Sequence, residues 1–530
     1  MQLNPTSKVA GTWIHTHDQE DKAQEKLESH YETWVKGLQA VVEFGKEKSV
    51  QAALLLLRYC VHQQARDFVS RYPLTQVKPY AKKMDDALGQ AVLDIIRCDF
   101  SPTQQDTRDR VVRQNRLPLT TGGMGLTSME CIAGHTFLQS VQKSLSNAPG
   151  DMKDMIKAWA TQDPDDPSYF FGGVLQTIKG IHAMVDDLDS CLKTAPGKPV
   201  LDSPAATCTE DQHRFIKQLT HHSVTPKSVK DLLPQADHAP SGNWLQTATK
   251  LTAILCSQLH WRSLPSGEEK TRFMSLTMEC SGEIYNVIPK SKSQRLKCDN
   301  LRYIIAHRLN IPLECTELRC VYDDELRCST KPDKCNALLT RHHLNTCSVE
   351  GSIIRRHDNG VHVLADMCRA GNFSQVCVEP RGLHPGEGMK GLDIEYVHYQ
   401  GGIGQRVGVD FSCVNLLATD MKWGPTRPGI AIKRMIANKV KKYGQMCKSE
   451  GMKLIPAVME TTGGFSQELS TLIHRAAKRA PQRPSPDTSF TCKSRYKYFA
   501  QKLLVAVLQT MAEEAREKVK QAKQLSHLQQ

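Results

Sequence analysis

The first half of the chain places apolar residues at intervals of three and four, the spacing of amphipathic helices. The pattern runs through residues 22–60, returns over residues 80–99, and starts again near Ser128. Gly122, Gly123 and Gly125 precede that last helix. Glycines at a helix start can hold a phosphate, but the Lys-Ser/Thr pair of a P-loop is missing. We therefore predict a packing turn.

The middle of the chain changes character. Residues 193–243 are rich in Pro, Asp, Ser, Thr and His, a composition typical of a linker. Helical spacing returns at residues 247–259, 268–287 and 302–309, the last ended by Asn310 and Pro312. A Lys/Glu-rich segment over residues 496–524 predicts a solvated amphipathic helix.

Between residues 358 and 460 helical and alternating patterns succeed one another. The predicted order is helix, three strands, helix, strand, and the overall class is α+β. Asp358 is the predicted N-cap of the first helix and Gly371 its C-terminal cap. The other elements are expected around residues 376–378, 392–396, 407–413, 429–450 and 454–459.

Two acidic residues stand out in the alternating segments. Asp393 and Asp410 each fall on the face opposite the apolar residues of its predicted strand. Two carboxylates on neighbouring strands can share Mg²⁺ or Mn²⁺, which lowers the pKa of a bound water. The alternative is a pair of surface aspartates at strand edges.

A lysine in the following helix fits the same chemistry. Lys439 lies at the edge of the predicted apolar stripe, and Lys442 lies further round. A lysine near the two acids could orient the metal-bound water. It could also neutralise the phosphorane that forms when this water attacks a phosphate. The predicted stripe consists of Ile432, Met435, Ile436, Val440, Tyr443 and Cys447.

A cysteine–histidine cluster precedes this region. Cys328, Cys335, His343 and Cys347 supply three thiolates and an imidazole, the ligand set of tetrahedral structural zinc. His342 competes with His343, and Cys320 and Cys315 compete with Cys328. The alternative is a loop with scattered cysteines.

Composition indicates the kind of partner and the cellular compartment. The chain of 530 residues has 69 Lys and Arg against 56 Asp and Glu, a net charge of +13 that favours a polyanionic partner. It shows no signal peptide and no apolar run near the 18 residues of a membrane span. Its 18 cysteines are therefore interpreted as mostly buried thiols in a reducing compartment, nuclear or cytoplasmic and not secreted.

Several motifs, in this order, resemble the C-terminal part of non-LTR retrotransposon polyproteins of the restriction-like-endonuclease class. The similarity covers most of residues 22–480. Its motifs are Leu54-Leu55-Leu56-Leu57-Arg58, Leu117-Pro118 with the glycine turn, Leu301-Arg302-Tyr303, His307 to Pro312, the cysteine–histidine cluster, Arg356-His357-Asp358, Val378-Glu379-Pro380, Gly408-Val409-Asp410 and Lys442-Tyr443.

The resemblance implies a domain order. It implies a helical thumb-like region that follows a reverse transcriptase (residues 1–190), a linker with helices (191–300), a helix with a zinc knuckle (301–350), a nuclease core of the PD-(D/E)xK type (351–480) and a C-terminal amphipathic helix (481–530).

The resemblance also implies residue roles and ligands. Asp393 is the first metal-binding acid and Asp410 the second, with Lys439 and then Lys442 as candidates for the catalytic lysine. His357 and Asp358 lie beside the site. The implied ligands are Mg²⁺ and structural Zn²⁺, and the implied partners are DNA and possibly element RNA, with no membrane or small-molecule substrate.

The sequence departs from the family at three places. Leu392 replaces the usual proline before the first acid, and the first two cysteines of the knuckle are spread apart. A polymerase palm motif is missing, because Tyr322-Asp323-Asp324 lies in a polar, cysteine-rich loop. We therefore expect an N-terminally truncated copy that nicks DNA but does not polymerise it alone. The alternatives are a non-catalytic nucleic-acid-binding remnant and a helical scaffold.

Overall fold

The computed structural model describes two compact units, residues 1–48 with 53–264 and residues 49–52 with 265–530. Within them it describes residues 6–9, 12–15, 20–146, 177, 179–181, 183, 244–265, 267–311, 339–347, 352–380, 391–400, 403–416, 429–480 and 494–528. None of the helices in these ranges is both long and apolar enough to cross a bilayer.

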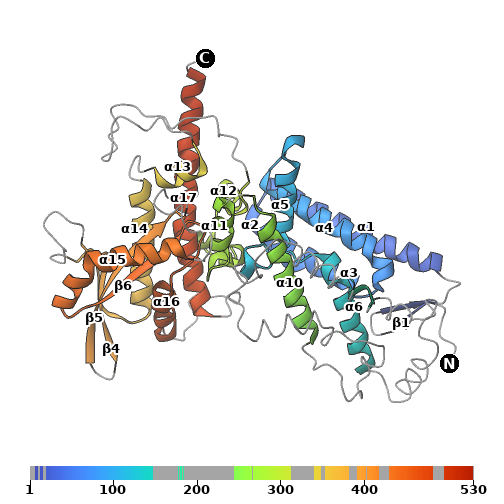
Figure 1. The fold of residues 1–530 in the computed structure, drawn as a ribbon, viewed down its shortest axis with the longest axis horizontal. Helices are drawn as coiled ribbons and strands as arrows, with labels where there is room; N and C mark the ends of the chain where they lie inside the picture. Colours follow the sequence, from blue (N-terminus) through green and yellow to red (C-terminus); the bar gives the residue numbers. More distant parts are fainter. Residues whose placement is uncertain are drawn as a thin grey trace, which may run out of the picture. The chain divides into compact units, whose positions relative to one another are not determined.

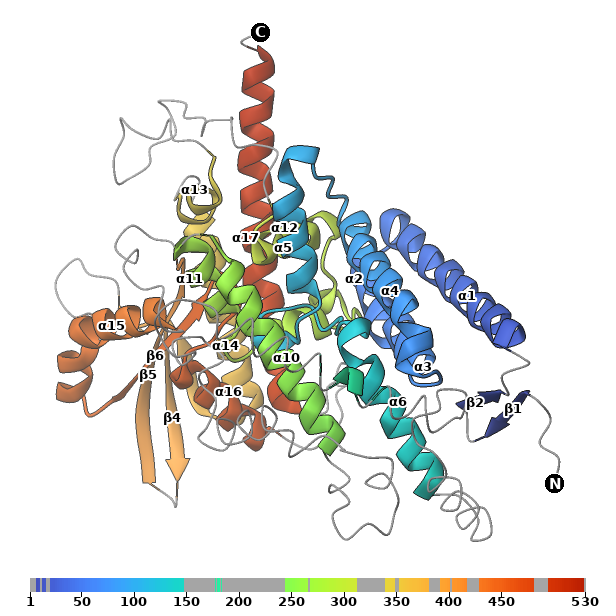
Figure 2. The ribbon, with the colours of Figure 1, turned by 45° about the vertical axis from the view of Figure 1, so that its right-hand side comes forward.

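The first unit is mostly helical, as the three-and-four spacing predicts. Its long helices α1 and α4 pack side by side, and α6 packs on α3 and α4 (Figures 1 and 2). A π-helical turn, Leu57–Val61, joins α2 to α3. The elements are β1 (Thr6–Val9), β2 (Thr12–His15), α1 (Glu20–Glu47), α2 (Val50–Leu56, partly in the second unit), α3 (His62–Val69), α4 (Leu74–Ile96), α5 (Gln105–Asn115), α6 (Met129–Ser146) and α10 (Trp244–Ser263).

The glycine-rich segment before α6 is a packing turn, as predicted. The backbone N–H of Gly123 donates to Pro118 O at 2.9 Å, and that of Gly125 donates to Leu117 O at 2.8 Å. A Cβ at position 123 would lie 2.0 Å from Leu117 O. Glycine is therefore required there to let the two chain segments approach.

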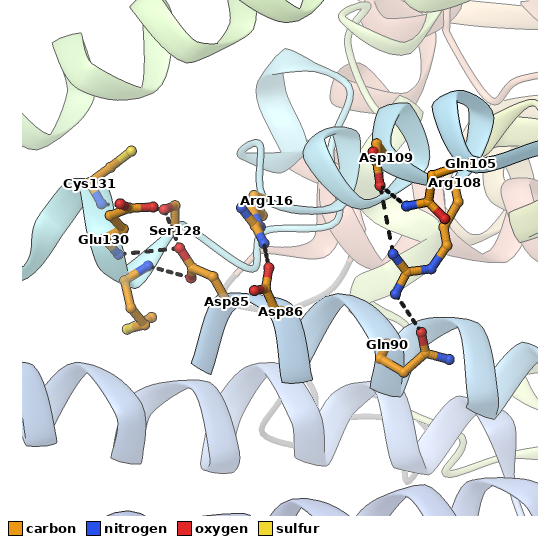
Figure 3. Close-up of polar contacts among 11 residues, drawn as sticks. Asp85, Asp86, Gln90, Gln105, Arg108, Asp109, Arg116, Ser128, Glu130 and Cys131 are labelled. Atoms are coloured by element: carbon orange, nitrogen blue, oxygen red, sulfur yellow. Dashed lines mark hydrogen bonds and ion pairs between the residues drawn. The ribbon is translucent and has the colours of Figure 1, made fainter. Parts of the chain in front are cut away.

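The N-terminus of α6 is capped by an acid from another helix. Asp85 of α4 is buried, and its carboxylate accepts hydrogen bonds from the backbone N–H of Met129 at 2.6 Å and of Glu130 at 3.2 Å. Ser128 Oγ donates to the same carboxylate (Figure 3). A carboxylate at this position satisfies N–H groups that have no partner within the helix and complements the helix dipole.

We expect Asp85→Ala to destabilise the first unit by about 2 kcal/mol, because it leaves these buried donors without acceptors. The matched control is Asp86→Ala on the same helix. Asp86 is exposed and pairs with Arg116 at 3.0 Å, so its loss should cost less than about 1 kcal/mol. Urea denaturation followed by circular dichroism measures both, and equal costs would contradict the capping role.

The second unit contains a four-stranded mixed sheet in the order β3-β4-β5-β6. β3, β4 and β5 are antiparallel, and β5 pairs with β6 in parallel through the crossover helix α15. The predicted order of helix, three strands, helix, strand is confirmed. The elements are α14 (Ser352–Ala370), β3 (Ser374–Val378), β4 (Ile394–Gln400), β5 (Ile403–Val414), α15 (Ile430–Ser449) and β6 (Lys453–Glu460).

Helices cover both faces of this sheet. Phe411 packs toward α14, where a Cβ at Gly360 would lie 2.3 Å from its ring. The neighbouring Asp410 contacts α15, since successive strand residues point to opposite faces. Figure 1 shows α15 lying across β5 and β6. The other helices of the unit are α11 (Gly267–Leu276), α12 (Cys298–Leu309), α13 (Arg341–Thr346), α16 (Gln467–Arg479) and α17 (Arg495–Leu528).

Three local predictions are wrong, and a fourth is only partly right. Asp358 lies inside α14, which begins six residues earlier at Ser352. Gly371 directly follows the last residue of α14, as predicted, but Asn372 takes the left-handed conformation, with φ of 53°. Val440 is half exposed rather than part of the apolar stripe. The helix expected over residues 268–287 ends at Leu276, and a 3₁₀ turn follows over Ser281–Asn286.

The C-terminal helix is also less solvated than predicted. The apolar stripe of α17 packs along α14, so the helix is part of the core over much of its length. Most of its charged residues lie away from this stripe, although Glu514 is buried. The buried side chains include Leu503, Leu504, Val507, Leu508 and Met511.

Candidate active site

Asp393 and Asp410 lie directly opposite one another at the start of the β4–β5 pair. Ile394 pairs with Val409, and the backbone N–H of Asp393 donates to Val409 O at 3.1 Å. Extending this register by one residue places the two acids opposite each other, where Cα atoms are roughly 4.5–5.5 Å apart. Both side chains are buried, with 1% and 5% exposed.

Lys439 approaches from α15 and is also buried, with 7% exposed. Its Nζ donates to Asp410 Oδ2 and to Phe411 O, the second at 3.1 Å. Lys442, the second lysine candidate, is exposed, and its Nζ lies 4.6 Å from the Tyr443 ring centroid. The structure therefore brings Lys439, and not Lys442, to the acids.

His357 links the site to α14. Its Nε2 lies 3.1 Å from Asp393 Oδ2, and its Nδ1 lies 3.1 Å from Asp358 Oδ1. The backbone N–H of Phe411 also donates to Asp393 Oδ2, at 2.6 Å. These contacts fix the Asp393 carboxylate from two sides.

The two carboxylates affect each other electrostatically. Burial raises the pKa of Asp410, the Lys439 charge opposes this rise, and Asp393 adds to it. Burial also raises the pKa of Tyr443, and Asp410 and Asp393 raise it further. Two buried acids that disfavour each other's charged form are a site where a further cation would be stabilising.

The two facing carboxylates fit the small number of protein ligands that Mg²⁺ or Mn²⁺ needs, although among the residues that the structure describes they do not form a larger ligand cluster. Within the described ranges, no group of three or more His, Cys, Asp and Glu side chains is arranged to hold a metal. Mg²⁺, however, keeps several waters and is commonly bound through one or two carboxylates. The facing pair Asp393 and Asp410 meets that smaller requirement.

Only part of the predicted zinc cluster lies in the described residues. The backbone N–H of His343 donates to Thr340 Oγ1 at 3.2 Å at the start of α13, and Cys347 is buried one turn later. Lys518 Nζ donates to Cys347 O at 2.8 Å. The rest lies outside the described part: Cys315, Cys320, Cys328, Cys335, Tyr322-Asp323-Asp324 and the side chain of His342.

Another buried acid of the second unit was not predicted as a functional residue. Glu460 at the end of β6 accepts a hydrogen bond from Ser275 Oγ, and burial raises its pKa to about 7. Ser275 Oγ also contacts Thr462 Oγ1. No spacing in the sequence could reveal this contact, because Ser275 and Glu460 are 185 residues apart.

We expect Glu460 to make the second unit less stable as the pH rises. A carboxyl with a folded pKa near 7 and an ordinary pKa of 4.5 stabilises the fold below pH 4.5, and this contribution is lost as the pH rises through 7. The loss is on the order of 3 kcal/mol. Urea denaturation at pH 5 and pH 8 should show it in the wild type. The pH dependence should be smaller in Glu460→Gln, where Glu514, whose pKa burial also raises to about 7, still contributes. The exposed Glu517→Gln is the control, and an unchanged pH dependence in Glu460→Gln would refute the assignment.

Four segments thus meet at one point. They are helix α14, Asp393 directly before β4, strand β5 and helix α15. They bring together two buried acids, a buried lysine and a histidine, a set suited to hydrolysis at a phosphate. No protein-family model, curated protein or solved structure matches this chain.

Proposed function

We propose that the second unit is a metal-dependent DNA endonuclease of the restriction-like class, derived from a non-LTR retrotransposon. One observation carries the proposal: Asp393 and Asp410 face each other across β4 and β5, with Lys439 Nζ on Asp410. The order of α14, three strands, α15 and β6 is the one expected for such a core. The reaction is hydrolysis of a phosphodiester bond, which nicks one strand.

Asp393 and Asp410 would hold Mg²⁺ or Mn²⁺. When bound, the ion supplies a water of lowered pKa and positive charge beside the scissile phosphate. Lys439 carries a positive charge at the same place, where it can orient the attacking water or neutralise the phosphorane. His357 holds Asp393 Oδ2 in position, with the N–H of Phe411 on the same oxygen.

Nicking of supercoiled plasmid tests this proposal. The wild type should convert the plasmid to open circles with Mg²⁺ and not with EDTA, and Asp393→Asn should lose this activity. Asp366→Asn is a matched control, because Asp366 is an exposed acid on α14. If the wild type does not nick, or Asp393→Asn nicks as fast, the endonuclease proposal fails.

The second candidate is a nucleic-acid-binding protein that does not cleave. The ion pair between Lys439 and Asp410 favours it, because that contact already neutralises one of the two acids. In that case the protein would bind duplex DNA in a gel-shift assay and leave supercoiled plasmid intact with Mg²⁺ and with Mn²⁺.

We also propose that His343 and Cys347 belong to a structural zinc site with Cys328 and Cys335. His343 and Cys347 lie four residues apart at α13, which suits two ligands of one ion. Purified protein should then contain about one zinc per chain by metal analysis, and Cys347→Ser should contain much less. Cys377→Ser is the control, since Cys377 is an exposed thiol on β3. Equal zinc in both variants would contradict the site.

A further inference from the structure

The crossover helix α15 has an unusual charge distribution. Over Ile430–Ser449 it contains no acidic residue and six basic ones. Lys439 points inward to Asp410. Lys433, Lys441 and Lys448 are exposed, and at about 100° per residue they fall within about 80° of one another around the helix axis. We call these three lysines the α15 lysine face.

Ion pairing sets this face apart from the basic residues of α17. None of its three lysines forms an ion pair with a residue that the structure describes. On α17, by contrast, exposed cations are paired: Lys497 with Glu283 at 3.0 Å, Arg516 with Asp299 at 2.8 Å and Lys520 with Glu517 at 4.0 Å. Within the described ranges, the charge of these three lysines is therefore not offset by an ion pair with an acid.

The chemistry of the face fits a polyanion. The exposed Asn438 and Gln445 are neutral hydrogen-bonding residues that lie beside the lysines around the helix. Lys433 and Lys448 are 15 residues apart, roughly 22 Å along the helix. A duplex presents one phosphate charge per about 1.7 Å of its axis, so a face of this length meets on the order of a dozen phosphates.

We propose that the α15 lysine face binds the phosphate backbone of duplex DNA. The inference rests on the proposed function, which makes DNA the substrate. One helix then serves two purposes: its inner side carries Lys439 to the acids, and its outer side holds the substrate. Contacts of this kind position a duplex without reading its sequence.

Salt-dependent binding of a labelled 30-bp duplex, measured by fluorescence anisotropy in EDTA with the full chain, tests the proposal. The variant is Lys433→Gln/Lys441→Gln/Lys448→Gln. Each lost phosphate contact lowers the slope of log K against log salt by about 0.9, so the slope should fall by about 2–3. Affinity at about 100 mM KCl should fall at least tenfold. The matched control, Lys497→Gln/Arg516→Gln/Lys520→Gln, removes the same charge from α17 and should change the slope by less than about one.

Each outcome separates the two proposals. Equal slopes for the two variants would overturn the inference, whether or not the wild type nicks plasmid. A lysine-dependent slope in a protein that never nicks would keep the inference and reject the nuclease. Lysine-dependent binding of single-stranded RNA but not of the duplex would also overturn it. Thermal melting checks that both variants are folded.

Discussion

Plasmid nicking is expected to fall at least about 100-fold in Asp410→Asn, because the change removes one of the two carboxylates that would hold the metal in the proposed site. Asparagine retains the size of the side chain and can still accept a hydrogen bond from Lys439 Nζ. The fold should therefore survive, and the loss should appear in the rate of the cleavage step.

The experiment compares initial nicking rates of wild type, Asp410→Asn and the exposed control Asp366→Asn at equal protein and Mg²⁺ concentrations. Binding of the duplex in EDTA should not weaken in Asp410→Asn, because the protein loses a negative charge. Equal nicking rates in wild type and Asp410→Asn would remove Asp410 from the metal site.

The second large effect concerns stability. We expect Asp410→Ala to destabilise the second unit by about 3–5 kcal/mol, because Lys439 is then a buried charge without its carboxylate. Lys439→Met should destabilise the second unit less than Asp410→Ala does. It leaves Asp410 buried beside Asp393, but the pKa of Asp410 is already raised, so the carboxyl can take up a proton instead of staying charged.

The double variant Asp410→Ala/Lys439→Met separates these contributions. It contains no unpaired charge at the two positions, so it should be more stable than Asp410→Ala alone. Urea denaturation at pH 7 of all four proteins gives the coupling energy directly. Additive costs would show that the two side chains do not depend on each other, contrary to the contact between Lys439 Nζ and Asp410 Oδ2.

The sequence could predict the acids because a strand alternates with period two. Asp393 and Asp410 each interrupt an apolar alternation, and that offset is visible without a structure. Lys439 was visible for a similar reason, since a lysine beside an apolar helical stripe is an exception to the usual pattern. Periodicity thus located three of the four residues at the site and the order of the elements that carry them.

Other features depend on contacts that periodicity does not encode. Asp358 resembles a capping residue in sequence, but packing of α14 along α17 extends the helix to Ser352. The contact of Ser275 with Glu460 joins distant segments through the tertiary fold. Val440 has the right spacing for the apolar stripe, yet α15 is rotated so that it is half exposed.

Helix α15 follows β5 and precedes β6 in the sequence, and this order has a consequence for folding. The β4–β5 hairpin pairs residues close in sequence, so it can form early and bring Asp393 next to Asp410. Lys439 reaches them only when β6 has paired in parallel with β5, a slower, non-local step. During refolding, a fluorescent reporter of the hairpin should therefore change before metal-dependent activity returns.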